Sequence, residues 1–182
     1  MGEWLSLTSE GRVIVEAMSA MGYDAMAVGR MDLIKGPEVA RERAKEASFL
    51  FLSANLVDKV TQQPLFDPYA VIIENGVRIG LIGLTDEQSQ AMPGVPEVAV
   101  VLDPEETAQQ LVEALRPNVD AIIVLSRLGL ERDRALAQRV PGIQVIVGGQ
   151  TRRLLREPER VGNTLIVQQG YDGEHLGYLT AT

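Results

Sequence analysis

Short apolar runs alternate with amphipathic segments along most of this 182-residue chain. Continuous apolar runs are typical of strands buried on both faces, whereas apolar spacings of three and four residues predict helices. The pattern predicts helices over residues 8–21, 36–47, 103–115 and 131–140. It predicts strands over residues 25–28, 49–54, 69–74, 77–85, 98–102, 120–126, 144–147, 163–169 and 176–180. This alternation predicts a single α/β domain over residues 1–182.

Turn and capping signals sharpen this prediction. Asn75-Gly76 joins two β-rich runs and is a strong hairpin signal, so the sheet should be mixed. Asp103-Pro104 is followed by two glutamates, and such an acidic first turn favours a helix start. We expect loops over residues 58–68 and 152–160 and an irregular crossing over residues 88–96.

Composition excludes several classes of partner. Apolar residues make up 46% of the chain and charged residues 23%, which is typical of a globular domain. The formal net charge is −8, the same sign as phosphate groups, so we expect neither nucleic acid nor an anionic membrane as partner. The apolar stretch over residues 70–84 is interrupted by Glu74, Asn75 and Arg78, and is no membrane span.

The first residues, Met1-Gly2-Glu3-Trp4, carry no basic segment and no signal-type apolar core, so we expect no signal peptide. The compartment stays open: we expect a cytoplasmic protein if the chain is complete, and an exported one if it is a piece of a longer exported protein.

The inventory of reactive side chains is small. The chain has no cysteine, which excludes disulfides, thiolate metal sites and cysteine nucleophiles. Its one histidine, His175, cannot form a multi-histidine metal site within one chain. His175 lies in the predicted turn over residues 170–177, where we expect an exposed loop residue rather than a catalytic one.

Three strand ends are candidates for a site, because sites in open α/β sheets form at the carboxyl ends of strands. They are Val28-Gly29-Arg30-Met31-Asp32, Leu125-Ser126-Arg127-Leu128-Gly129 and Val147-Gly148-Gly149-Gln150-Thr151-Arg152.

These strand ends and their neighbours resemble the metallophosphoesterase domain of the 5'-nucleotidase family. The matching segments are Gly11–Gly29, Leu52-Ser53-Ala54-Asn55, Ile79–Thr85, Asp120–Glu131, Ile146–Arg152, Asn163–Gly170 and Leu176-Gly177. They cover nearly the whole chain, in the family's order and spacing. The resemblance implies a calcineurin-like α/β/β/α sandwich with mixed sheets. It also implies the family's chemistry, hydrolysis of nucleotide phosphate esters by two divalent metals.

This sequence departs from the family at the metal ligands. The family's Asn-His pair falls on Arg30 and Met31, its strand-end His on Arg127, and its His-x-His pair on Gln150 and Arg152. Arginine has no lone pair to donate, and methionine suits copper rather than the hard ions of phosphoesterases. We therefore expect no resident metal and no catalytic residue. The family's earlier metal-binding motifs would precede Leu5, so the first strands of the fold are also expected to be missing.

Two interpretations of these replacements stay open. Three guanidinium groups at converging strand ends could hold a phosphate-bearing small molecule, since arginine forks match phosphate geometry. This candidate anion site comprises Arg30, Arg127, Gly148, Gly149, Gln150 and Arg152. Alternatively the pocket has decayed, and its arginines reach solvent or pair with Asp32 and Glu131. Asp32 is expected to pair with Arg30 or Arg127 in a structural role.

The sequence thus predicts a degenerate, non-catalytic member of the family that acts as an anion-binding or structural module. One alternative is an active metal-dependent phosphoesterase whose ligands come from elsewhere. Another is an interaction domain, since missing first strands would expose an apolar sheet edge. A second copy or a partner chain is expected to cover that edge.

Overall fold

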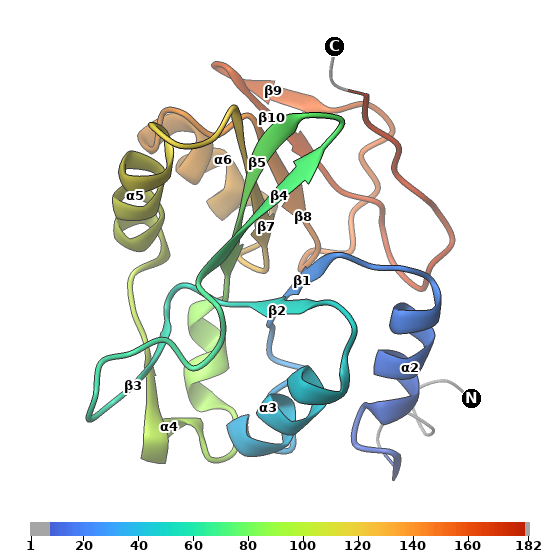
Figure 1. Ribbon diagram of the computed structural model, residues 1–182, viewed down its shortest axis with the longest axis vertical. Helices are drawn as coiled ribbons and strands as arrows, with labels where there is room; N and C mark the ends of the chain where they lie inside the picture. Colours follow the sequence, from blue (N-terminus) through green and yellow to red (C-terminus); the bar gives the residue numbers. More distant parts are fainter. Residues whose placement is uncertain (1–7, 181–182) are drawn as a thin grey trace.

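The computed structural model describes residues 8–180, and its largest element is a six-stranded mixed sheet (Figure 1). The strand order is β4-β5-β7-β8-β10-β9. The strands are β4 (Tyr69–Glu74), β5 (Val77–Leu84), β7 (Ala121–Ser126), β8 (Val145–Gly148), β9 (Glu159–Val161) and β10 (Thr164–Val167). The four inner strands run parallel, and β4 and β9 pair antiparallel at the two edges. The predicted mixed α/β fold is confirmed.

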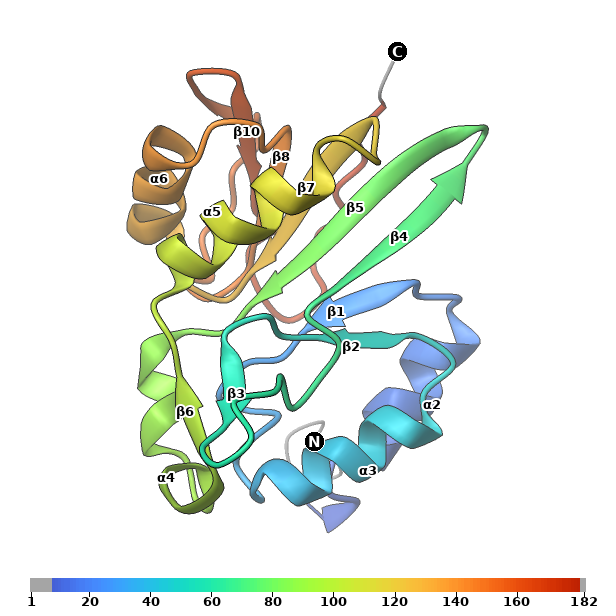
Figure 2. The same ribbon diagram turned by 60° about the vertical axis from the view of Figure 1, so that its left-hand side comes forward.

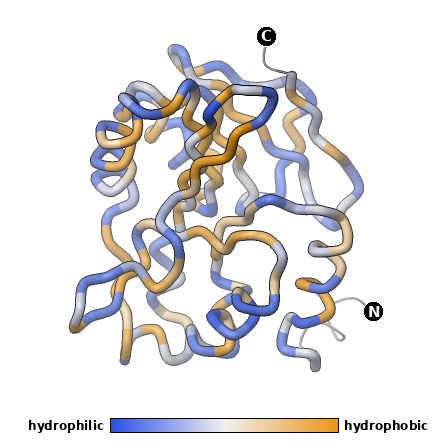
Figure 3. Tube along the Cα trace, in the orientation of Figure 1, coloured by the Kyte–Doolittle hydropathy of each residue, from blue (hydrophilic) through white to orange (hydrophobic). Residues whose placement is uncertain are grey.

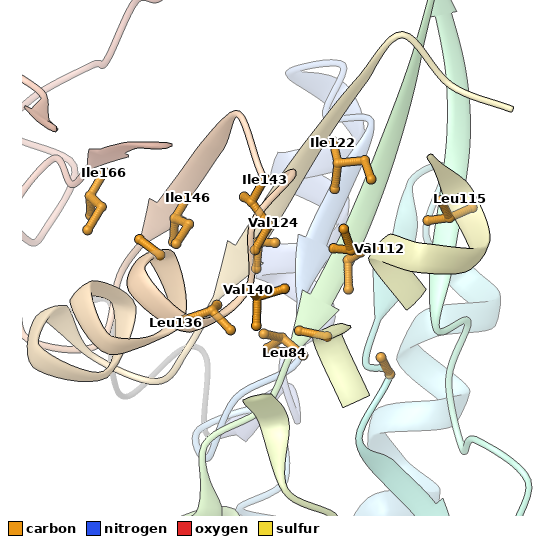
Figure 4. Packing of buried hydrophobic residues seen from close by; sticks show 14 of the residues in the cluster. Leu84, Val112, Leu115, Ile122, Val124, Leu136, Val140, Ile143, Ile146 and Ile166 are labelled. Carbon is orange, nitrogen blue, oxygen red and sulfur yellow. The ribbon is translucent and has the colours of Figure 1, made fainter. Parts of the chain in front are cut away.

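Two helices, α5 (Pro104–Leu115) and α6 (Leu130–Arg139), cover one face of this sheet (Figure 2). Figure 4 shows the core between them, where apolar side chains of the strands meet those of the helices. Val124 and Ile146 of the sheet are fully buried there together with Leu136 of α6. The core follows from the continuous apolar runs, because every second strand residue must point to the helix face.

A second, smaller layer lies beyond the carboxyl ends of the large sheet (Figure 2). Its strands β1 (Ala25–Ala27) and β2 (Leu50–Leu52) form a parallel pair packed on α2 (Arg12–Ala20) and α3 (Pro37–Glu46). Stacked rings of Phe49, Phe51 and Phe66 fill its core. An antiparallel pair, β3 (Leu56–Asp58) and β6 (Ala99–Val101), completes the layer with η1 (Glu87–Ala91) and α4 (Val95–Val98).

Buried polar side chains join the two layers. The Asn55 side chain donates to the Thr85 carbonyl and accepts from the Thr85 N–H, each at 2.9 Å. The Thr85 hydroxyl donates to the Val28 carbonyl at 2.8 Å and lies 2.6 Å from the Ser53 hydroxyl. Since all these groups are paired in a buried place, they fix the small layer against the end of β5.

The hairpin and the helix start agree with the sequence. Asn75 and Gly76 both have positive φ, 50° and 84°, which is the conformation of a two-residue type I′ turn. The Asp103 side chain accepts a hydrogen bond from the Glu106 N–H at 2.8 Å and caps α5. Local residue chemistry was sufficient to predict both features.

Two predictions of local structure were wrong, and two were correct except at their ends. Residues 176–180 form no strand; they are exposed, with Leu176 96% exposed, so no neighbouring strand pairs with them. The expected loops are confirmed over residues 59–68 and 152–158, and only their ends lie in short strands, at Asp58 of β3 and at Glu159 and Arg160 of β9. The expected irregular crossing holds η1 and α4. β3 depends on a distant partner, β6, which local sequence does not reveal, whereas β9 pairs with the next strand, β10, across Gly162-Asn163.

Figure 3 shows that the longest hydrophobic stretches follow the strands rather than the helices. Within residues 8–180, no helix has both the length and the apolar character needed to cross a bilayer. The segment Met1-Gly2-Glu3-Trp4, used above to argue against a signal peptide, lies outside the described residues.

Candidate functional site

A hollow of about 620 Å³ lies where the carboxyl ends of β1, β7 and β8 meet. Two of the predicted strand ends contribute Arg127, Gly148 and Gly149 to its wall, and the third contributes Met31 and Asp32. Apolar side chains of α2 and α3 form much of the remaining wall. The topology therefore brings three segments that are far apart in sequence to one place, as expected for parallel strands.

Arg127 lies in the wall of this hollow together with the more deeply buried Arg43. The Arg127 guanidinium lies against two glycines: a Cβ on Gly29 would be 3.1 Å from its Cζ, and a Cβ on Gly149 3.1 Å from its Nη1. Its Nε is buried and has no hydrogen-bond partner in residues 8–180. A buried donor without an acceptor is costly, and this Nε is closed to solvent because it lies against the Gly29 backbone.

Asp32 forms the turn beside Arg127. Its carboxylate accepts a hydrogen bond from the Gly29 N–H at 2.8 Å. Burial raises the pKa of Asp32, while the Gly29 hydrogen bond and the charge of Arg127 act in the opposite direction. Asp32 therefore closes the loop after β1 and faces Arg127, but its hydrogen bond goes to the backbone.

Arg30 points toward a different set of partners. Its Nη1 donates to Gln88 at 2.5 Å, and its Nε lies 3.6 Å from an Asp86 carboxylate oxygen. The Gln150 amide oxygen, turned toward Arg30, accepts from the Arg30 Nε at 3.0 Å. Arg30 thus ties the ends of β1 and β8 to η1 and does not pair with Asp32.

Arg152 lies on an exposed turn with φ 54°. Its backbone N–H lies 3.0 Å from the Gln168 amide oxygen when that oxygen faces the loop. Within the part of the chain described, its side chain has no hydrogen bond or ion pair. The structure therefore places Arg127 in the hollow, Arg30 and Gln150 together beside it, and Arg152 on the exposed turn that follows.

Comparison with known proteins gives this arrangement a family context. The chain is 34% identical to a 5'-nucleotidase of Bos taurus over 93% of its own length and 34% of that protein. It matches the structure of a 5'-nucleotidase precursor from Thermus thermophilus with a TM-score of 0.80 and 35% identity, over 87% of this chain and 35% of that one.

This chain is homologous to the 5'-nucleotidases. It also matches the sulfate thiohydrolase SoxB of Thermus thermophilus, with a TM-score of 0.84 and 30% identity over 91% of this chain and 31% of that one. No family model matches the chain. The chain spans about a third of the length of these relatives. The predicted resemblance is confirmed over most of the chain.

The side chains of residues 8–180 do not form a two-metal centre. In residues 8–180, no three His, Cys, Asp or Glu side chains are grouped so that they could hold a metal ion. The matching strand ends carry a guanidinium at Arg127 and a thioether at Met31, and hard divalent cations prefer oxygen and imidazole ligands. His175 is exposed in the 171–180 segment, as predicted.

One group that sequence reasoning missed lies directly behind the hollow. Asp133, in the first turn of α6, is fully buried, and its carboxylate accepts a hydrogen bond from the Ser126 hydroxyl. Its other oxygen has no partner among the residues described and lies against the Gly148 backbone. Burial raises the pKa of Asp133 to about 6, although the Ser126 hydrogen bond opposes the shift.

A sequence signal for this carboxylate existed. Asp133 occupies the same helical stripe as Leu130, Leu136 and Val140, all of which are buried. An acid in an apolar stripe of a helix points into the core and needs a partner there.

Proposed function

We propose that this domain binds a phosphate-bearing small molecule without hydrolysing it, and that Arg127 is the main anion ligand. The observation that carries the proposal is the Arg127 guanidinium in the wall of the hollow, which has no hydrogen bond and no ion pair in residues 8–180. Planar guanidinium N–H groups match phosphate oxygens in pairs, and such charge-assisted hydrogen bonds are strong in a partly desolvated place.

The backbone around Arg127 supports the same proposal. The guanidinium occupies the space that a Cβ at position 29 or 149 would need, so these two glycines allow it to lie where it does. Gly148 and Gly149 end β8 beside it, and backbone N–H groups at such a strand end can add to anion binding. Arg30 and Gln150 are not part of the wall of the hollow, and they pair with each other. Arg152 would close over the ligand only if its exposed turn moves.

The absence of hydrolysis is proposed from the chemistry of the donors. Two-metal hydrolysis needs ligands that hold both ions and a water between them. Arginine at positions 30, 127 and 152 offers donors only, and it repels a second cation. These arginines could instead donate hydrogen bonds to the phosphate group that a pair of metal ions would otherwise bind.

The competing function is an active, metal-dependent phosphoesterase, and the similarity to proteins named 5'-nucleotidase favours it. It would require metal ligands from outside residues 8–180. Turnover that depends on an added divalent metal distinguishes the two functions.

The test is calorimetric titration of the full chain with inorganic phosphate and with adenosine monophosphate, in EDTA and in Mn²⁺, with release of phosphate assayed in the same preparations. We expect binding in EDTA, no turnover in either buffer, and loss of binding in Arg127→Ala. Arg116→Ala is the matched control, because Arg116 is an exposed arginine that ends α5 before β7 begins, at the opposite end of the sheet. Mn²⁺-dependent turnover, or unchanged affinity in Arg127→Ala, would overturn the proposal.

A further inference from the structure

Asp133 of α6 lies under the turn that carries Arg127. Side chains alternate along β7, so Val124 and Ser126 point toward α6 and Leu125 points to the hollow. Arg127 follows in the same alternation and lines the hollow. Ser126 is 2% exposed and meets the carboxyl of Asp133 on the helix side of the sheet. The two faces of one strand end therefore carry the proposed anion ligand and a buried acid.

A chain of hydrogen bonds joins this acid to the turn over residues 126–129. The Ser126 hydroxyl donates to the Asp133 carboxylate and accepts from the Leu128 N–H at 3.1 Å. The Asp133 N–H donates to the Gly129 carbonyl at 2.9 Å. Arg127 lies between these points, and its own N–H donates to a carbonyl of β5 at 2.9 Å. Asp133 thus holds both ends of the turn that places Arg127.

The second carboxylate oxygen of Asp133 lies against the end of β8. A Cβ on Gly148 would be 2.7 Å from this oxygen, so only glycine leaves room for the carboxyl there. Among the residues described, the oxygen has no hydrogen-bond partner. Gly148 and Gly149 line the hollow beside Arg127. A negative charge on this oxygen would lack a donor and would lie directly behind the hollow.

In the part of the chain described, the groups that face this carboxyl are neutral. They are the Ser126 hydroxyl of β7, the Gly148 backbone of β8 and the Gln168 amide of β10. On α6 itself, the charged neighbours pair with other side chains: Glu131 with Arg134, Arg132 with Glu87 and Arg134 with Glu159. Across the strand end, the charged groups in the wall of the hollow are Glu10, Asp32, Lys35, Arg43 and Arg127. Burial therefore dominates and raises the pKa of Asp133 to about 6, against the effect of the Ser126 hydrogen bond.

We propose that Asp133 is a positioning residue for the anion site proposed above, on which this inference rests, and that its charge controls how tightly Arg127 holds an anion. The protonated acid holds the turn through Ser126 and places no charge behind the hollow. The ionised acid repels the anion through the strand end. At an effective dielectric constant of about 20, two like charges about 10 Å apart repel enough to weaken binding roughly tenfold. By linkage, a bound anion opposes ionisation of Asp133 by the same factor.

The test is calorimetric titration of the full chain with sulfate in EDTA between pH 5 and pH 8. Sulfate keeps the same charge across that range, whereas phosphate titrates within it. We expect the wild-type affinity to fall about tenfold as the pH rises from about 6 to 7. Asp133→Asn, which keeps an acceptor for Ser126, should hold the wild-type affinity of pH 5 at every pH. Glu131→Gln is the matched control, because it removes an exposed carboxylate from the same helix turn and should keep the wild-type profile.

Ser126→Ala tests the link between the acid and the turn. It removes the hydroxyl that accepts from the Leu128 N–H and leaves the carboxyl in place. At pH 5, where Asp133 is protonated, we expect sulfate affinity to fall about tenfold and the Leu128 amide to exchange faster. Thr164→Val is the control, because the Thr164 hydroxyl is also buried but bonds the Ile143 carbonyl, outside the wall of the hollow. Unchanged affinity in Ser126→Ala would contradict the positioning role.

An NMR titration of the Asp133 carboxyl in the wild-type chain needs no substitution to fold. The pKa of Asp133 should rise by about one when sulfate is bound. An unchanged pKa of Asp133, or a wild-type affinity that stays constant from pH 5 to pH 8, would overturn the inference. So would a pH dependence that persists in Asp133→Asn, which would assign it to Asp32, whose pKa is also raised by burial.

These results are separate from a failure of the anion site. Sulfate and phosphate that do not bind at any pH, or that bind Arg127→Ala as tightly as wild type, would overturn the proposed function and this inference with it. Binding that needs Arg127 but ignores the charge of Asp133 would leave the proposed function standing and overturn this inference alone.

Discussion

Asp133 gives the sharpest test of how this site is built, because its carboxyl is buried and holds only one hydrogen bond among the residues described. The substitution Asp133→Asn keeps the size of the side chain and an oxygen that can accept from Ser126. It removes the charge that burial disfavours. The variant therefore isolates the cost of ionising this group behind the hollow.

The magnitude follows from the pKa. The carboxyl titrates at about 6 in the folded protein, against 3.8 as its ordinary value. One pKa unit corresponds to about 1.4 kcal/mol, so ionisation costs the folded state on the order of 3 kcal/mol. Because the pKa of Asp133 is raised in the folded protein, its protonated carboxyl contributes stability that is fully present below about pH 4. That contribution is lost as the pH rises through about 6.

The assay is urea unfolding of the wild-type chain and of Asp133→Asn between pH 4 and pH 8. We expect the free energy of unfolding of Asp133→Asn, measured relative to that of wild type, to rise by about 3 kcal/mol as the pH rises from 4 to 8. Glu131→Gln is the control, since it removes a carboxylate from the same helix turn at an exposed position. A difference between wild type and Asp133→Asn that stays constant from pH 4 to pH 8 would refute the reasoning.

Three further substitutions test the local arguments. Gly29→Ala places a methyl group against the Arg127 guanidinium, and it should weaken phosphate binding by roughly tenfold to a hundredfold in calorimetry; Gly80→Ala, which makes only ordinary contacts, should leave binding intact. Gly76→Ala forces a side chain to φ 84° and should cost about 1 kcal/mol in urea unfolding, and an unchanged midpoint would contradict the turn assignment. Asp103→Ala removes the α5 cap and should also cost about 1 kcal/mol; thermal melts equal to wild type would show that the cap is dispensable.

Elements with strong local chemistry were predictable from the sequence. The hairpin at Asn75-Gly76 requires two left-handed residues, which asparagine and glycine tolerate, and the structure has both. The parallel strands were also predictable, because a strand buried on both faces is apolar throughout. By contrast, β3 consists of three residues and forms only where the distant strand β6 offers partners.

The candidate site was predictable as a location but not as an arrangement. Strand-end positions followed from the α/β pattern, and the structure brings Arg127, Gly148 and Gly149 to one hollow. The sequence could not reveal that Arg30 would turn to Asp86 and Gln88, since η1 reaches it only through tertiary packing. The sequence reasoning also did not single out Asp133, whose raised pKa results from its burial.

The sequence by itself determined the long helices and the longer strands, the strand ends at which chemistry must lie, and the residue types available there. These follow from periodicity and side-chain chemistry, which are local properties. Only the tertiary structure decided which guanidinium is buried without an acceptor and which carboxyl is forced to keep a raised pKa. Those depend on what surrounds each group, because desolvation and hydrogen bonding are set by neighbours that the chain brings together from distant positions.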